Sequence, residues 1–152
     1  MIEMSPADDG SKRSKSLLIA VTIGWVILFS YLLLTAASDL PVIGPIRLIS
    51  YEDPGHLFGS LLLGFLVYLV FARWTGRAWW AAAFALIGTV GFLVGLEFLQ
   101  ELRPGRGYQR LDIQLSLIGA SAGVAAGLLL HLIGRFRARR ASEAPSGEEP
   151  GA

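Results

Sequence analysis

The chain has 152 residues, a formal net charge of +1 at pH 7, 53% hydrophobic residues and only 16% charged residues. A soluble domain usually carries about 25% charged residues, so this composition is typical of a single domain embedded in a bilayer, and the small net charge predicts no nucleic-acid partner. Because the chain has no cysteine, disulfides, thiol catalysis and thiolate metal sites are excluded.

The first predicted transmembrane helix lies in the uncharged stretch 16–38. It is long enough to cross a hydrocarbon core of roughly 30 Å at about 1.5 Å per residue. Residues 1–15 are polar, and we expect a disordered cytoplasmic tail there. A signal peptide is the competing interpretation, but its apolar region is normally about 7–15 residues, shorter than Leu17–Leu34, and Thr35-Ala36-Ala37 matches a cleavage site poorly.

Three further apolar runs predict three more transmembrane helices. A loop with three prolines covers 39–54, Arg73 and Arg77 frame a tight turn, and an arginine-rich loop covers 101–111. The polar segment 137–152 predicts a second disordered cytoplasmic tail. The apolar runs are 57–72, 78–96 and 113–134. The sequence therefore predicts an all-α integral membrane bundle of four transmembrane helices, with the membrane domain over 16–136.

Lysine and arginine are unevenly distributed between the two ends of this bundle. Nine lie in the N-terminal segment, the 73–77 turn and the C-terminal end, whereas four lie in the other two loops. Basic residues are enriched on the cytoplasmic side of membrane proteins, so we expect both termini to be cytoplasmic. Tryptophans at 74, 79 and 80 lie near the predicted inner boundary, where they suit an anchoring aromatic belt.

Polar side chains collect at the opposite, extracytoplasmic end. His56 opens the second span, Glu97 and Gln100 end the third, and Asp112 precedes the fourth. Ionisable residues directed into a helical bundle are costly and usually mark a site or a pathway. The sequence therefore predicts a site at this end. Because no ionisable residue lies in the middle of a span, a proton or ion channel is disfavoured.

Helical spacing indicates which of these residues point inward. Asp112, Ser116, Gly119 and Gly123 step by four, three and four and share one face. In the second span, residues 56, 60 and 64 (His, Ser and Gly) repeat by four. Small residues at such spacing let helices approach closely, so both faces are predicted packing faces.

The third span carries glycines at 91 and 95, which likewise predict a close-packing face. Glu97 is rotated away from these glycines. Either this helix contacts partners on two sides, or its last turn is irregular. His131 lies near the cytoplasmic end of the fourth span, on the face of Gly119 and Gly123, and we expect it to pack or to extend toward the membrane surface.

The segment Arg103-Pro-Gly-Arg106-Gly predicts a sharp turn. Its glycines let backbone N–H groups converge and its arginines offer forked donors, a combination that binds phosphate or carboxylate. The predicted ligand-binding residues are His56, Glu97, Gln100, Arg103, Arg106, Asp112 and Ser116.

At these residues the chain resembles the VanZ-like family, membrane proteins associated with glycopeptide (teicoplanin) resistance. The segment 52–58, Glu-Asp-Pro-Gly-His-Leu-Phe, resembles the family's acidic residue shortly before a histidine that opens a transmembrane helix. Glu-x-x-Gln at 97–100, Pro-Gly-Arg at 104–106, Asp112 and Gly-Ala at 119–120 resemble the second part of the pattern. The resemblance covers about residues 50–127.

Two positions depart from that pattern. Pro54 and Gly55 stand where a lysine is common, and Ser116 stands where an asparagine is expected. The resemblance implies a small multi-pass protein of the bacterial cytoplasmic membrane that acts in the cell envelope. It supplies no reaction.

Three interpretations of the polar residues stay open. In the structural one, Glu97, Arg103, Arg106 and Asp112 pair and fasten helix ends, although exposed pairs contribute only about 0–1 kcal/mol. In the second, the site binds the headgroup of an amphiphile or of a cell-envelope precursor. The arginines then hold its anionic group, while Glu97, Gln100 and Asp112 orient it.

In the third interpretation, the protein is a membrane enzyme that acts on a lipid-linked or phosphorylated envelope substrate. Glu97 or His56 is then the general base, Asp112 orients His56, and the arginines stabilise developing charge. No nucleophile elbow, paired-histidine zinc motif or phosphate loop supports this interpretation. We predict no cofactor. A metal site built from His56, Glu97 and Asp112 is a weaker alternative, because their spacing carries no ligand signature. The expected partners are membrane lipids and an amphiphilic or lipid-linked envelope ligand.

Overall fold

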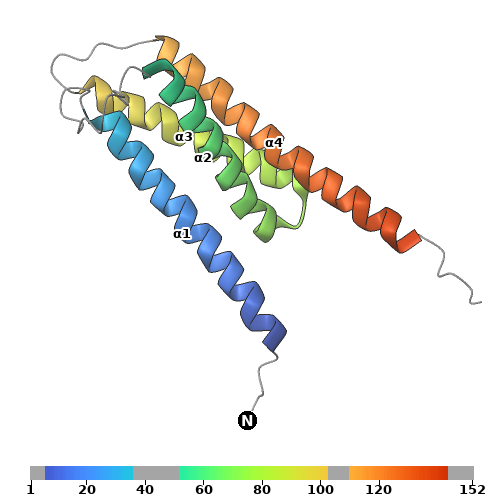
Figure 1. Ribbon diagram of the computed structural model, residues 1–152. Coiled ribbons are helices and arrows are strands. Elements are labelled where there is room, and N and C mark those ends of the chain that lie inside the picture. The colour runs from blue at the N-terminus through green and yellow to red at the C-terminus, as the bar shows by residue number, and fades with distance from the viewer. Residues whose placement is uncertain (1–5, 36–51, 103–109, 144–152) are drawn as a thin grey trace, which may run out of the picture.

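The computed structural model describes residues 6–35, 52–102 and 110–143, and these ranges form four α-helices (Figure 1). The helices are α1 (Pro6–Leu34), α2 (Glu52–Thr75), α3 (Ala78–Glu101) and α4 (Arg110–Glu143). Each contains a stretch long and apolar enough to cross a membrane, and the described ranges contain no strand. The predicted all-α bundle of four transmembrane helices is confirmed. That both termini are cytoplasmic stays a prediction.

Two helices extend beyond the predicted spans. α1 begins at Pro6 and α4 continues to Glu143, so residues 6–15 and 137–143 are helical rather than irregular. Once an apolar span is helical, each added residue gains a hydrogen bond without a new nucleation cost, and lysine and arginine are good helix formers. The rest of the two predicted tails lies outside the described residues.

α2 and α4 approach each other more closely than a side chain would allow. A Cβ atom added to Gly119 would overlap the carbonyl oxygen of Leu57, and one added to Gly123 would overlap that of Leu61. From the other side, a Cβ on Gly64 would overlap the carbonyl oxygen of Ala120. The predicted small-residue faces of both helices are therefore confirmed.

α3 uses a different face from the predicted one. Gly91 and Gly95 are exposed, and no described atom lies within 4 Å of a Cβ built on either. The α3 side chains that face the bundle are Ala78, Ala81, Ala85, Thr89, Leu93, Leu96 and Gln100. Alanines at helical spacing are small enough for close packing, so α3 does not need its glycines for it. The prediction that α3 packs through Gly91 and Gly95 is therefore wrong for contacts within the described residues.

α1 packs against the bundle through its second half. The Nε1 of Trp25 donates a hydrogen bond to the carbonyl oxygen of Gly59 (3.1 Å), and the Phe29 ring lies against Gly59. Trp25 and Phe29 stack with their ring centroids 6.0 Å apart. The first half of α1 diverges from the other helices (Figure 1). The contacts of α1 are therefore concentrated near the end of the bundle where α2 and α4 begin.

Candidate functional site

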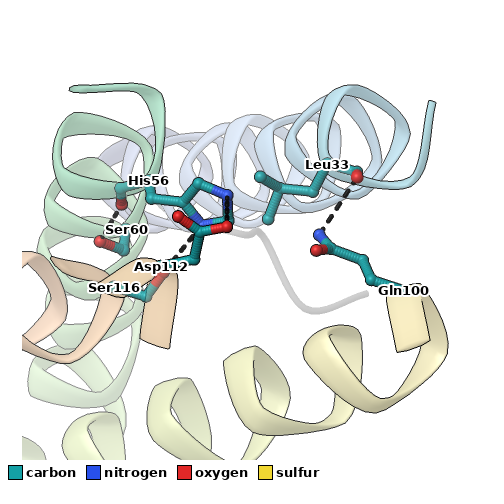
Figure 2. Close-up of polar contacts among 6 residues, drawn as sticks. All are labelled: Leu33, His56, Ser60, Gln100, Asp112 and Ser116. Carbon is teal, nitrogen blue, oxygen red and sulfur yellow. Dashed lines mark hydrogen bonds and ion pairs between the residues drawn. The ribbon is translucent and has the colours of Figure 1, made fainter. Parts of the chain in front are cut away.

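The polar cluster, defined as His56, Ser60, Asp112 and Ser116, lies between the N-terminal parts of α2 and α4, within about the first three turns of each helix (Figure 2). His56 is 2% exposed, Asp112 3% and Ser116 6%. The four-residue spacing predicted that each helix directs its polar pair along one face, and the close approach of α2 and α4 places the two faces together. We call this the His56 end of the bundle.

The imidazole of His56 lies between a hydroxyl and a carboxylate. Its Nδ1 is 3.2 Å from the Oγ of Ser116, and its Nε2 is 3.6 Å from Oδ2 of Asp112. The second distance is too long for a strong direct hydrogen bond but short enough for electrostatic attraction. The hydroxyl of Ser60 donates to the backbone carbonyl of His56 (2.5 Å), which ties the side chain at 60 to the same turn.

One carboxylate oxygen of Asp112 accepts no hydrogen bond from the described part of the chain. Its Oδ1 atom is buried and has no hydrogen-bond partner among the described residues. Buried polar atoms in native proteins are nearly always hydrogen-bonded, to protein or to ordered water. A carboxylate oxygen is an acceptor only, so this position is suited to an N–H or O–H donor from water or from a ligand.

Glu97 reaches the cluster from α3 through a small cavity. The cavity offers about 10 Å³ to the centre of a water molecule, which is about one water. It is lined by Glu97, Ser116, Leu93, Val94, Ile113 and Leu117. Ser116 therefore contacts His56 and also borders the cavity that Glu97 lines. Helices α2, α3 and α4 thus each contribute a polar group around Ser116, as the sequence predicted for one level of the bundle.

Gln100 has a different environment from the other predicted site residues. Its Nε2 donates a hydrogen bond to the carbonyl oxygen of Leu33 (3.1 Å), in the last turn of α1, and its side chain is buried (Figure 2). The last carbonyls of a helix lack partners within the helix, so Gln100 satisfies one of them. This contact links α3 to α1. Sequence reasoning missed it because the acceptor is a backbone atom.

The remaining predicted ligands are only partly placed. Arg103 and Arg106 lie outside the described residues, as does the Pro-Gly-Arg turn. Among the described residues, no group of three histidine, cysteine or acidic side chains could hold a metal ion. His131 lies edge-on to the ring of Tyr68, with centroids 6.2 Å apart, in agreement with a packing role.

No family model, curated protein or solved structure matches the chain. The resemblance to VanZ-like proteins therefore stays a hypothesis that rests on the motifs around His56, Glu97 and Asp112.

Proposed function

We propose that the protein is a VanZ-like multi-pass protein of the bacterial cytoplasmic membrane whose polar site binds the headgroup of an amphiphile or of a cell-envelope precursor. The observation that carries this proposal is the unsatisfied Oδ1 of Asp112, buried beside His56 and Ser116. A buried acceptor without a donor costs about 1–3 kcal/mol. A cluster that served only to fasten α2 to α4 gains nothing from this cost, whereas a binding site uses the free acceptor.

The site suits a headgroup that carries both donors and an anionic group. Asp112 accepts an N–H or O–H from the ligand, and Ser116 can donate or accept. Glu97 offers a second carboxylate across the cavity. Arg103 and Arg106, in the turn predicted to bind anions, hold the phosphate or carboxylate. The predicted orientation, with the His56 end outside the cell, gives this site access to envelope precursors.

Antibiotic susceptibility tests the proposal directly. Cells expressing the wild type at a measured membrane level are compared with cells expressing Asp112→Asn or Glu97→Gln at the same level. The wild type should shift susceptibility to teicoplanin, and both variants should abolish the shift. Glu97→Asp, which keeps the charge, should be partly tolerated. The control is Gln114→Ala, an exposed position on α4 that should keep the shift.

Different outcomes would refute the role in antibiotic resistance and the function of the polar site. A wild type that does not shift teicoplanin susceptibility would refute the resistance role. A full shift in Asp112→Asn would refute the site. Folding stability is measured for each variant, so that a loss of the shift through unfolding is recognised.

Enzyme action is the second candidate, and the specific observation that favours it is the position of the His56 imidazole between Asp112 and Ser116. A carboxylate beside an imidazole is one arrangement in which a histidine acts as a general base. In this mechanism His56 or Glu97 accepts a proton from the attacking water or hydroxyl. The purified protein is assayed with a lipid-linked pyrophosphate. Glu97→Gln or His56→Gln should reduce turnover by orders of magnitude while substrate binding survives. Equal loss of binding and turnover would assign these residues to binding, and no turnover by the wild type would refute enzyme action.

A further inference from the structure

α4 carries a second charged surface at the end of the bundle opposite to the polar cluster. We define the arginine segment as 132–140, which contains Arg135, Arg137, Arg139 and Arg140. All four arginines are exposed, and this part of α4 projects past the connection between α2 and α3 (Figure 1). Lys12, Arg13 and Lys15 near the start of α1, and Arg73 and Arg77 at the connection between α2 and α3, lie on the same predicted side of the membrane. This end of the molecule is therefore strongly positive.

Apolar side chains alternate with these arginines. Leu132, Ile133 and Phe136 are exposed on the same turns, and the guanidinium carbon of Arg140 lies 4.5 Å from the centroid of the Phe136 ring. Together with the four arginines they form the exposed surface of this segment of α4. A guanidinium held over an aromatic ring is partly ordered before any ligand arrives. The surface combines apolar contact with forked cationic donors.

The apolar span that precedes the arginines determines their depth relative to the bilayer. At about 1.5 Å per residue, Arg135 to Arg140 covers about 7.5 Å along the helix axis. The headgroup layer on each side of a bilayer is about 5–8 Å thick, the difference between a core of about 30 Å and a total of about 40–45 Å. When the apolar run 113–134 fills the hydrocarbon core, Leu132 and Ile133 face acyl chains and the guanidinium groups lie at the level of the lipid phosphates.

We propose that the arginine segment is a binding site for the phosphate groups of anionic phospholipids. Arginine forks match phosphate oxygens bidentately, and basic clusters immediately beyond a transmembrane helix favour anionic lipid. A lipid fits this surface better than a nucleic acid does, because the aliphatic Leu132 and Ile133 match acyl chains and neither stacks on a base nor hydrogen-bonds to one. This site shares no residue with the polar cluster and does not depend on its function.

Lipid competition tests the site in the full-length protein. The protein is reconstituted in vesicles of equal parts phosphatidylglycerol and phosphatidylcholine, extracted, and the retained lipids are counted by native mass spectrometry. The wild type should retain phosphatidylglycerol preferentially. Replacing all four arginines by glutamine should lower this preference at least about tenfold, since it removes every forked donor that can bind the lipid phosphates bidentately. Phe136→Ala keeps every charge, and should lower it about twofold even if the glutamine variant folds poorly.

A second four-charge variant distinguishes a specific lipid-binding site from a general effect of positive charge. Replacing Lys12, Arg13, Lys15 and Arg73 by glutamine removes the same net charge from the same end, and should lower the preference no more than about twofold. An equal loss in the two four-charge variants would assign the preference to net charge and overturn the site. Equal retention of both lipids by the wild type would also overturn it. Displacement of the bound lipid by excess inorganic phosphate would show a site for free anions rather than for lipid.

Discussion

Gly123→Ala tests whether the close approach of α2 and α4 holds the protein together. The added Cβ would overlap the carbonyl oxygen of Leu61 and lie 2.8 Å from the backbone nitrogen of Phe65. Both are backbone atoms, so no side-chain rotation relieves the contact. Bringing the Phe65 contact alone to the 3.4 Å of ordinary packing needs a separation of about 0.6 Å, and relieving the deeper overlap with Leu61 needs more. Overpacking of this kind costs about 1–3 kcal/mol, more than the gain of up to about 1 kcal/mol from replacing glycine by alanine in a helix.

The control is the same substitution at Gly91, where no described atom lies within 4 Å of the new Cβ. Gly91→Ala should be neutral or slightly stabilising, because helix propensity alone remains. Both variants are unfolded reversibly in mixed micelles of increasing denaturing detergent, and unfolding is followed by the tryptophan emission. Equal stability of Gly123→Ala and Gly91→Ala would refute the packing of α2 against α4 described above.

Three further substitutions probe single contacts in the same unfolding assay. Gln100→Met should destabilise by about 1 kcal/mol by removing the hydrogen bond to Leu33, and no change would mean that this bond contributes nothing. Trp25→Phe keeps an aromatic ring but loses the hydrogen bond to Gly59, so the free energy of unfolding should fall by about 0.5–1.5 kcal/mol. A larger fall would show that ring packing contributes more than the hydrogen bond. Tyr68→Phe should be neutral or stabilising, because the Tyr68 hydroxyl is buried without a partner among the described residues; clear destabilisation would contradict this.

The number and position of the helices followed from hydropathy because a bilayer admits few alternatives. Every backbone polar group must be satisfied within the segment, so an uncharged run of sufficient length forms a helix. The ends of the helices were less predictable. Pro6 and Glu143 begin and end helices far outside the apolar runs, since in water a charged helix and an irregular chain differ little in free energy.

The polar cluster was predictable because four-residue spacing in a helix fixes direction. His56 with Ser60, and Asp112 with Ser116, had to share faces with glycines, and glycines indicate close packing. The same rule failed on α3, where Gly91 and Gly95 are exposed and alanines form the contact. A small residue permits an approach without requiring one, and sequence alone does not say which of two small-residue faces receives a neighbour.

The position of Asp112 explains how a bilayer protein tolerates a buried carboxylate. Asp112 lies in the first turn of α4, where the free N–H groups and the helix dipole favour negative charge. The same position brings it to the interface with α2, because Gly119 and Gly123 hold the two backbones together in the following turns. The helix N-terminus therefore offsets part of the cost of burying this carboxylate, while the Oδ1 atom still lacks a donor within the described ranges. A substitution at Gly123 should then disturb the contact between His56 and Asp112 as well as stability, although no atom of Gly123 belongs to the cluster.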